Sequence, residues 1–153
     1  MNRDERLIIQ DITRVRGAGY LAVRDALSGK LLDYSRFHNL DTTAGKNIMR
    51  DLYIGNTLDF PKYVALGTND STPNIADAAL YNEKVRIVIT SRLPASGQAT
   101  IRGYFGETVG NGETYKEAGL LTDGNILTAR AIFSAIAKTA SVTITINWIK
   151  YWA

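Results

Sequence analysis

Apolar and polar residues alternate along the second half of the chain, as is typical of β-strands with one buried face. The clearest strand covers residues 142–148, in which Val142, Ile144, Ile146 and Trp148 share one face and polar residues occupy the other. The same alternation predicts further strands, separated by turns rich in Gly, Pro and Asn, at residues 62–67, 84–93, 99–107, 114–121 and 126–133. Because no helical period separates them, the pattern predicts a mainly β fold, an antiparallel β-sandwich or barrel-like domain, and argues against a parallel α/β sheet.

The first part of the chain also begins with strands. Residues 6–16 are rich in Leu, Ile and Val and predict a strand that the glycines within 17–19 would break. Residues 20–25 and 31–37 then predict a β-hairpin around a turn at 27–30.

The period changes after this hairpin and predicts one helix over about residues 42–54. Apolar residues recur there at helical spacing, namely Ala44, Ile48 and Leu52. Asp41 or Thr42 supplies an N-cap for this helix. A chain of 153 residues has the length of a single domain. We therefore expect one domain, in which a hairpin and helix within 1–60 pack on a β-sandwich formed by 61–153.

The composition narrows the classes of protein to which the chain can belong. The absence of cysteine excludes disulfides and thiolate metal sites. Apolar residues at 45% and charged residues at 22% are typical of folded domains. No secretory signal follows Met1 and no apolar run is long enough to span a membrane, so we expect no membrane partner. Basic and acidic residues are interspersed and the formal net charge is only +3, which argues against a nucleic-acid partner.

Patterns that carry catalysis or bind cofactors are not found in the sequence. The single histidine, His38, lies at the end of a predicted strand, and neither a Gly-x-Ser-x-Gly nucleophile nor a cysteine nucleophile is present. The glycine-rich stretches 103–106 and 110–112 lie between strands, whereas phosphate-binding loops precede a helix. We therefore predict no catalytic residues and no cofactor. A glycan-cleaving enzyme stays an alternative, with paired carboxylates drawn from Glu107, Glu113 and Glu117.

One loop is rich in oxygen ligands of the kind that Ca²⁺ prefers, namely Asn69, Asp70, Asn74 and Asp77. Their spacing does not match a calcium-binding EF-hand, and Asn and Asp favour loops because their side chains bond to nearby backbone groups. We therefore predict no metal site.

Glu117 interrupts an otherwise apolar strand. If its carboxylate points inward, it needs a cationic partner, and Arg86 and Arg130 are the candidates because each lies within a predicted strand. Such a pair would be structural. The alternative is a solvated position on the outer face of the strand.

Two groups of residues are candidate contacts with other protein chains. Near the C-terminus, Ile149, Tyr151 and Trp152 fall on the face opposite Trp148 or beyond the strand end, where a monomer would expose them. In the N-terminal hairpin, aromatic residues stand among mixed charges, a composition that suits an interface, namely Tyr20, Tyr34 and Phe37. For the C-terminal group, burial of both faces at a sandwich edge is the alternative.

The order of several phrases over residues 63–152 resembles that of tailed-bacteriophage virion structural proteins of the tail fibre, adaptor or head-decoration type. The phrases are YVALGTNDSTPNIADAAL (63–80), NEKVRIVITS (82–91), GYFGETVGNGETYKEAGLL (103–121) and ILTARAIFSAIAKTASVTITINW (126–148). The upstream phrases VRDALSGKLLD and NLDTTAGKNIMRDL also resemble the leader of such proteins. The chain departs from the pattern at residues 67–70, where it reads Gly-Thr-Asn-Asp and related sequences often read Gly-Thr-Gly-Thr.

The resemblance implies a non-enzymatic virion component, assembled in the bacterial host cytoplasm and contacting other phage virion proteins. It implies no catalytic residues. Virion appendages are commonly symmetric, so we expect a homo-oligomer, with a trimer favoured. A tail-associated fibre, adaptor or baseplate protein is our first expectation. A head decoration protein and a glycan- or receptor-binding module are the alternatives.

Overall fold

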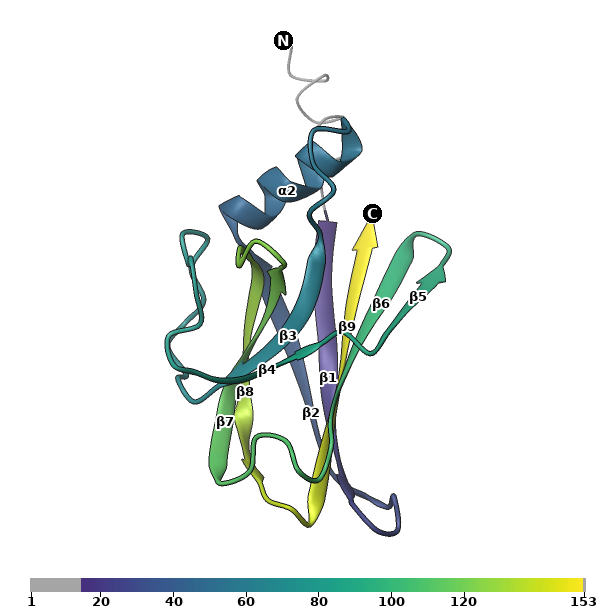
Figure 1. Cartoon of the computed structure of the whole chain (residues 1–153), viewed down its shortest axis with the longest axis vertical. Helices are drawn as coiled ribbons and strands as arrows, with labels where there is room; N and C mark the ends of the chain where they lie inside the picture. Colours follow the sequence, from purple (N-terminus) through teal and green to yellow (C-terminus); the bar gives the residue numbers. More distant parts are fainter. Residues whose placement is uncertain (1–14, 153) are drawn as a thin grey trace.

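The computed structural model describes residues 15–152 of the chain, which form one antiparallel sheet and one helix (Figure 1). The elements are β1 (Val15–Asp25), β2 (Leu31–Asp41), α2 (Thr43–Tyr53), β3 (Pro61–Gly67), β4 (Glu83–Val88), β5 (Ser91–Ala95), β6 (Gln98–Phe105), β7 (Glu113–Thr122), β8 (Leu127–Lys138) and β9 (Val142–Trp152). The prediction of a mainly β, antiparallel fold with one helix is confirmed. Within the described residues, no helix has the length and apolar character needed to cross a membrane.

The nine strands lie in the order β4-β3-β7-β8-β2-β1-β9-β6-β5. The sheet curls into a half-barrel with a concave inner face and a convex outer face, and both edges remain open (Figure 1). β2 joins the two halves of this sheet. Most of β2 pairs with β1, whereas only its last residues, 39–41, pair with β8.

The N-terminal hairpin lies in the middle of the sheet instead of packing on it. β1 pairs with β9 along its whole length, from Val15 opposite Trp152 to Asp25 opposite Val142. The expected break at 17–19 is therefore wrong. A Cβ at Gly17 or Gly19 would collide with atoms of the neighbouring strands. These glycines therefore allow close packing within a continuous strand. The strand predicted over 6–16 lies outside the described residues, except for its last two.

The helix forms where the sequence predicts it. Thr42 is the N-cap, and its hydroxyl accepts a hydrogen bond from the Gly45 N–H at 2.9 Å. The same hydroxyl donates to the Leu127 carbonyl at 2.6 Å, which fastens the start of α2 to β8. Gly45 faces β8 so closely that a Cβ there would lie 2.6 Å from the Thr128 Cα. A glycine that is unfavourable for an isolated helix is therefore required by the helix–sheet contact.

The strand expected over 84–93 is divided in two. β4 ends at Val88, and the chain then crosses from one edge of the sheet to the other, where the Thr90 N–H donates to the Arg102 carbonyl at 2.8 Å. Pro94, expected in a turn, lies inside β5. This is possible because β5 is an edge strand, where a missing N–H need not break the sheet.

The main core fills the concave face. Trp148 is fully buried there, and its ring meets that of Phe37 edge to face, with 5.0 Å between the ring centroids. The expectation that Phe37 contacts another chain is therefore wrong. The absence of a side chain at Gly19, the residue opposite Phe37 on β1, leaves room for the phenyl ring inside the core.

Candidate interaction surfaces

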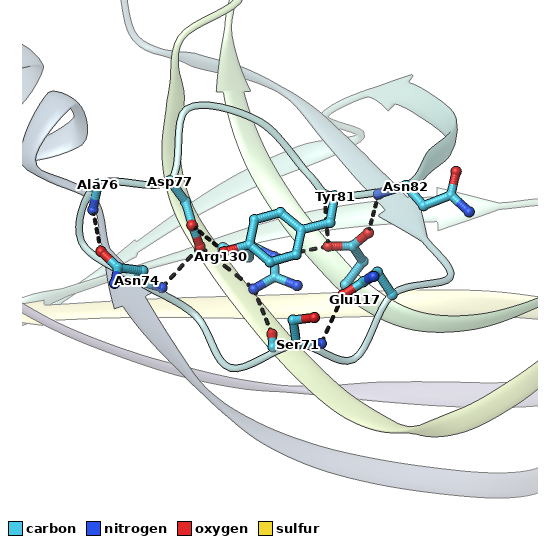
Figure 2. Close-up of polar contacts among 9 residues, drawn as sticks. Ser71, Asn74, Ala76, Asp77, Tyr81, Asn82, Glu117 and Arg130 are labelled. Atoms are coloured by element: carbon cyan, nitrogen blue, oxygen red, sulfur yellow. Dashed lines mark hydrogen bonds and ion pairs between the residues drawn. The ribbon is translucent and has the colours of Figure 1, made fainter.

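A buried ion pair lies on the convex side of the sheet, beneath the loop of residues 68–82, here called the clamped loop (Figure 2). Arg130 Nε of β8 donates to Glu117 Oε2 of β7 at 2.8 Å, and the exposed fraction of both side chains is 0%. Arg86, the other expected partner of Glu117, pairs with Glu83 instead, at 2.8 Å. Its strand, β4, is separated from β7 by β3, so the expected Arg86–Glu117 pair is wrong.

The ion pair holds both ends of the clamped loop. Glu117 accepts hydrogen bonds from the backbone N–H groups of Asn82 at 2.8 Å and Tyr81 at 3.2 Å. Arg130 Nη1 donates to the Ser71 carbonyl at 2.8 Å. The Tyr81 ring covers the guanidinium of Arg130, whose Cζ lies 4.2 Å from the ring centroid (Figure 2). Both buried charges are thus used to fix loop backbone to the sheet.

Asp77 is the third charged member of this cluster. Its carboxylate lies 3.5 Å from Arg130 Nη1 and accepts from the Tyr81 hydroxyl at 2.7 Å and from the Asn74 N–H at 2.9 Å. The hydrogen bond to Asp77, with burial second, raises the pKa of the Tyr81 phenol above its usual value.

The oxygen-rich residues of the loop serve its own backbone. Asn69 Oδ1 accepts from the Ser71 N–H at 2.8 Å, and Asn74 Oδ1 accepts from the Ala76 N–H at 2.9 Å. Among residues 15–152, no group of three or more His, Cys, Asp and Glu side chains is placed to hold a metal ion. Asn69 and Asn74 thus hold the conformation of the loop, whereas Asp70 pairs with Lys116 and Asp77 with Arg130.

A second surface is the convex face of β2, β1, β9 and β6, where side chains form rows across the strands. In one row, Arg36, Tyr20, Asn147 and Arg102 are consecutive partners. The next row contains Tyr34, Ala22, Thr145 and Tyr104. The rings of Tyr20 and Tyr34 stack, with 5.2 Å between centroids. Tyrosine and arginine are residues that recognition surfaces favour.

The described convex positions of these four strands carry arginine but no carboxylate. Arg24 and Arg36 on the hairpin and Arg102 on β6 supply the positive charge. The neighbouring outward residues are Tyr, Thr, Asn, Gln, His, Ala, Leu or Ile. A face of this kind attracts anionic groups.

A third surface is the apolar rim, defined as Tyr53, Ile54, Leu58, Phe60, Val88 and Trp152. Tyr53 and Ile54 lie at the C-terminal end of α2, Leu58 and Phe60 on the segment that leads to β3, Val88 at the end of β4 and Trp152 at the end of β9. The helix α2 stands at one end of the half-barrel, here called its mouth (Figure 1). Tyr53 is 93% exposed, Leu58 89% and Trp152 51%. Leu58, Phe60 and Val88 line one groove, and Trp152 with Pro61 lines an apolar cavity of about 170 Å³. The rim is therefore a set of large apolar side chains in contact with water.

The mouth also holds a partly buried ion pair between Asp41 of β2 and Lys150 of β9. Burial lowers the pKa of the Lys150 ammonium, and the adjacent carboxylate opposes that shift. Asn39 Nδ2 also donates to the Asp41 carboxylate, at 3.1 Å. The pair connects strands from the two sides of β1 and sits against the apolar cavity.

The residues predicted to contact other chains lie on more than one surface of the protein. Tyr20, Tyr34 and Ile149 lie on the convex face, with Tyr151 one row beyond Ile149 on the same side. Trp152 belongs to the apolar rim instead, since it shares the concave side with Trp148, the strand position four residues earlier.

Sequence reasoning missed three residues of the convex face, namely Arg102, Tyr104 and Asn147, of which Asn147 is buried and accepts a hydrogen bond from Arg102. The signal that could have found them is the alternation itself, since each lies at a position opposite to a buried neighbour. Their register across β6 and β9 joins residues 45 positions apart. No local pattern specifies that pairing.

No protein-family model, no curated protein and no solved structure matches the chain. Functional proposals therefore rest on the residues themselves.

Proposed function

We propose that this chain is a non-enzymatic structural component of a tailed-bacteriophage virion. The proposal places it on the tail, as a fibre, adaptor or baseplate protein, and has it assemble as a symmetric homo-oligomer, with a trimer favoured. The class of protein comes from the resemblance of residues 63–152 to virion structural proteins. The assembly mode comes from the surfaces of the molecule.

The observation that carries the assembly proposal is the apolar rim. Three of its side chains, those of Leu58, Phe60 and Val88, line one groove, and a group of exposed apolar side chains of this kind is typical of a protein–protein contact. Tyr53 and Leu58 are almost fully exposed, and neither is required by the core of the half-barrel. Burial of a Leu or Phe side chain in an interface contributes roughly 1.5–3 kcal/mol.

Rigidity of the subunit also supports a structural role. The clamped loop is held by a fully buried ion pair, and its backbone bonds to both charges. Glu117, the most enclosed carboxylate among those considered for catalysis, already accepts three hydrogen bonds. This arrangement favours a positional role for Glu117 over proton transfer.

Sedimentation equilibrium of the purified chain tests the assembly proposal. We expect a trimer that dissociates in the double variant Leu58→Ser/Phe60→Ser. Leu27→Ser is the matched control, because Leu27 is 97% exposed at the hairpin tip, at the other end of the molecule (Figure 1). A wild-type chain that is monomeric at high concentration, or equal dissociation by the control variant, would refute assembly through the rim.

Labelling of phage particles with an antibody against the chain tests the virion role. Label on the tail is the expected result in electron micrographs. Label on the capsid would replace the tail proposal with head decoration. Particles free of label, with the protein found only in lysate, would refute the virion role altogether.

A further inference from the structure

We propose that a groove on the convex face binds an acidic carbohydrate, a sugar ring that bears a carboxylate. The groove has a volume of about 430 Å³ and lies over β9, between β1 and β6. Its floor is made of short side chains, namely Ala22, Thr145 and Asn147. This site goes beyond the proposed virion role and does not depend on it.

The walls of the groove come from the two strands that flank β9. Tyr20 and Arg24 stand on β1, and Arg102 and Tyr104 stand on β6. Adjacent strands are about 4.8 Å apart, so walls separated by two strand spacings stand roughly 10 Å apart. One sugar ring fits between them and can lay its apolar C–H face on a tyrosine ring. A pocket of this size with aromatic walls and a few fixed polar groups is typical of small-ligand sites.

Arg102 is held in position for a ligand. Its Nε donates to Asn147 Oδ1 at 2.8 Å, and Asn147 is buried in the groove floor. Within the described part of the chain, Nη1 and Nη2 of Arg102 form no hydrogen bond and no ion pair. A guanidinium fixed through Nε keeps its other edge for a carboxylate, which it can bind with two parallel hydrogen bonds.

The electrostatics of the groove select an anion. Two of its wall residues are arginines, and no Asp or Glu lines it. Arg24 Nη1 donates to the Gly29 carbonyl at 3.1 Å, so this second guanidinium is also held in place. A carboxylate entering the groove therefore meets positive charge from both walls and no opposing charge from the protein.

The backbone of the groove favours a sugar over an extended peptide. β9 is paired with β1 on one side and with β6 on the other, so the floor has no free backbone edge for a peptide strand to join. The groove instead offers side-chain hydroxyl, phenol, amide and guanidinium groups. Sugar hydroxyl groups both donate and accept hydrogen bonds and match this set.

Binding of defined oligosaccharides to the full chain tests the site. The probes are trigalacturonate and sialyllactose, and their uncharged counterparts are galactotriose and lactose. We expect saturable binding of at least one acidic probe in isothermal titration calorimetry, and at least about tenfold weaker binding of its neutral counterpart, because charge-assisted bidentate bonds would be lost.

Variants distinguish the groove from general attraction to a basic surface. Arg102→Met is expected to weaken binding of the acidic probe by about tenfold or more. Tyr104→Ala is expected to weaken this binding as well. Arg36→Met is the matched control, because Arg36 is on the same face and outside the groove, and we expect it to change binding less than about twofold. Circular dichroism of each variant verifies its fold, and Arg102→Lys, which retains the charge, replaces Arg102→Met if that variant is unfolded.

Several results would overturn the inference. Absence of binding by both acidic probes would remove the carbohydrate site. Equal losses in Arg102→Met and Arg36→Met would show that general charge attracts the probe. Binding of poly-L-glutamate as tight as that of the acidic sugars would assign the groove to acidic protein segments instead. None of these results bears on the particle-labelling experiment, so this site and the virion role fail separately.

Discussion

Removal of Glu117 tests the buried ion pair that holds the clamped loop. Glu117→Ala leaves Arg130 buried with its principal counter-charge gone, and it deprives the Tyr81 and Asn82 N–H groups of their acceptor. Breaking a buried pair by removing one partner costs about 3–5 kcal/mol, because an uncompensated buried charge stays behind. Asp77, at 3.5 Å from Arg130, compensates part of that charge, which places the expected loss near the lower limit.

Urea unfolding followed by circular dichroism measures this loss as a decrease in the free energy of unfolding. For a chain of this size, a loss of about 3 kcal/mol lowers Tm by roughly 6–12 °C. The released loop is also expected to be cut by thermolysin under native conditions, near Ile75 or Leu80, whereas the clamped loop of the wild type is expected to resist cleavage.

The control for this experiment is the neighbouring exposed pair of Lys116 and Asp70. Their side-chain atoms are 3.4 Å apart and both residues are accessible to water, so Lys116→Met is expected to cost less than about 1 kcal/mol. If Glu117→Ala and Lys116→Met lower the free energy of unfolding equally, the reasoning about the clamp is refuted. A double-mutant cycle with Arg130→Met isolates the coupling, since replacing both charges is expected to cost less than the sum of the single changes.

Substitutions at three other positions are expected to change the stability of the protein in a stated direction. Gly45→Ala is expected to destabilise the protein by about 1–3 kcal/mol in urea unfolding, because its Cβ would collide with Thr128; helix propensity alone predicts a gain of about 1 kcal/mol, so a gain would refute the packing argument. Thr42→Ala is expected to cost about 1–2 kcal/mol through loss of the N-cap, whereas Thr42→Ser retains the hydroxyl and should stay close to wild type. Protonated Tyr81 donates to Asp77 and its folded-state pKa is raised, so this contribution to stability is complete below pH 10.0 and disappears as the pH rises through the folded-state pKa. Tyr81→Phe should abolish that part of the alkaline loss, and an unchanged alkaline profile would contradict the assignment.

Many strands and the helix could be predicted because each follows from a local pattern of apolar and polar residues. The strict alternation at 142–148 predicts β9, and the spacing of Ala44, Ile48 and Leu52 predicts α2. Glu117 stood out because it interrupts an apolar strand, and the sequence left open whether it is a buried charge with a cationic partner or a solvated residue on the outer face. Its partner could not be chosen between two arginines, since that choice depends on the strand order, which places β8 beside β7 and β4 beyond β3.

Other features depend on contacts that no local pattern contains. Gly17 and Gly19 look like a strand break, yet each leaves room for a neighbouring strand. In the sequence, Phe37 resembles a surface aromatic residue among charges. In the structure it lies opposite Gly19 and packs against Trp148. The groove requires β1, β9 and β6 in a fixed register. Sequence periodicity predicts which way a side chain faces, but it does not predict which strand lies beside it.

The pairing of β1 with β9 has a consequence for how the protein is made. One side of β1 is completed only by β9, so all of residues 15–152 must leave the ribosome before that ladder closes. Until then, one edge of the early hairpin is open to wrong partners, including the hairpin of another nascent copy. Long-range closure of this kind is typically slow. The sheet is therefore expected to close only after β9 has emerged, and the yield of folded protein should fall when many copies are produced together at high temperature.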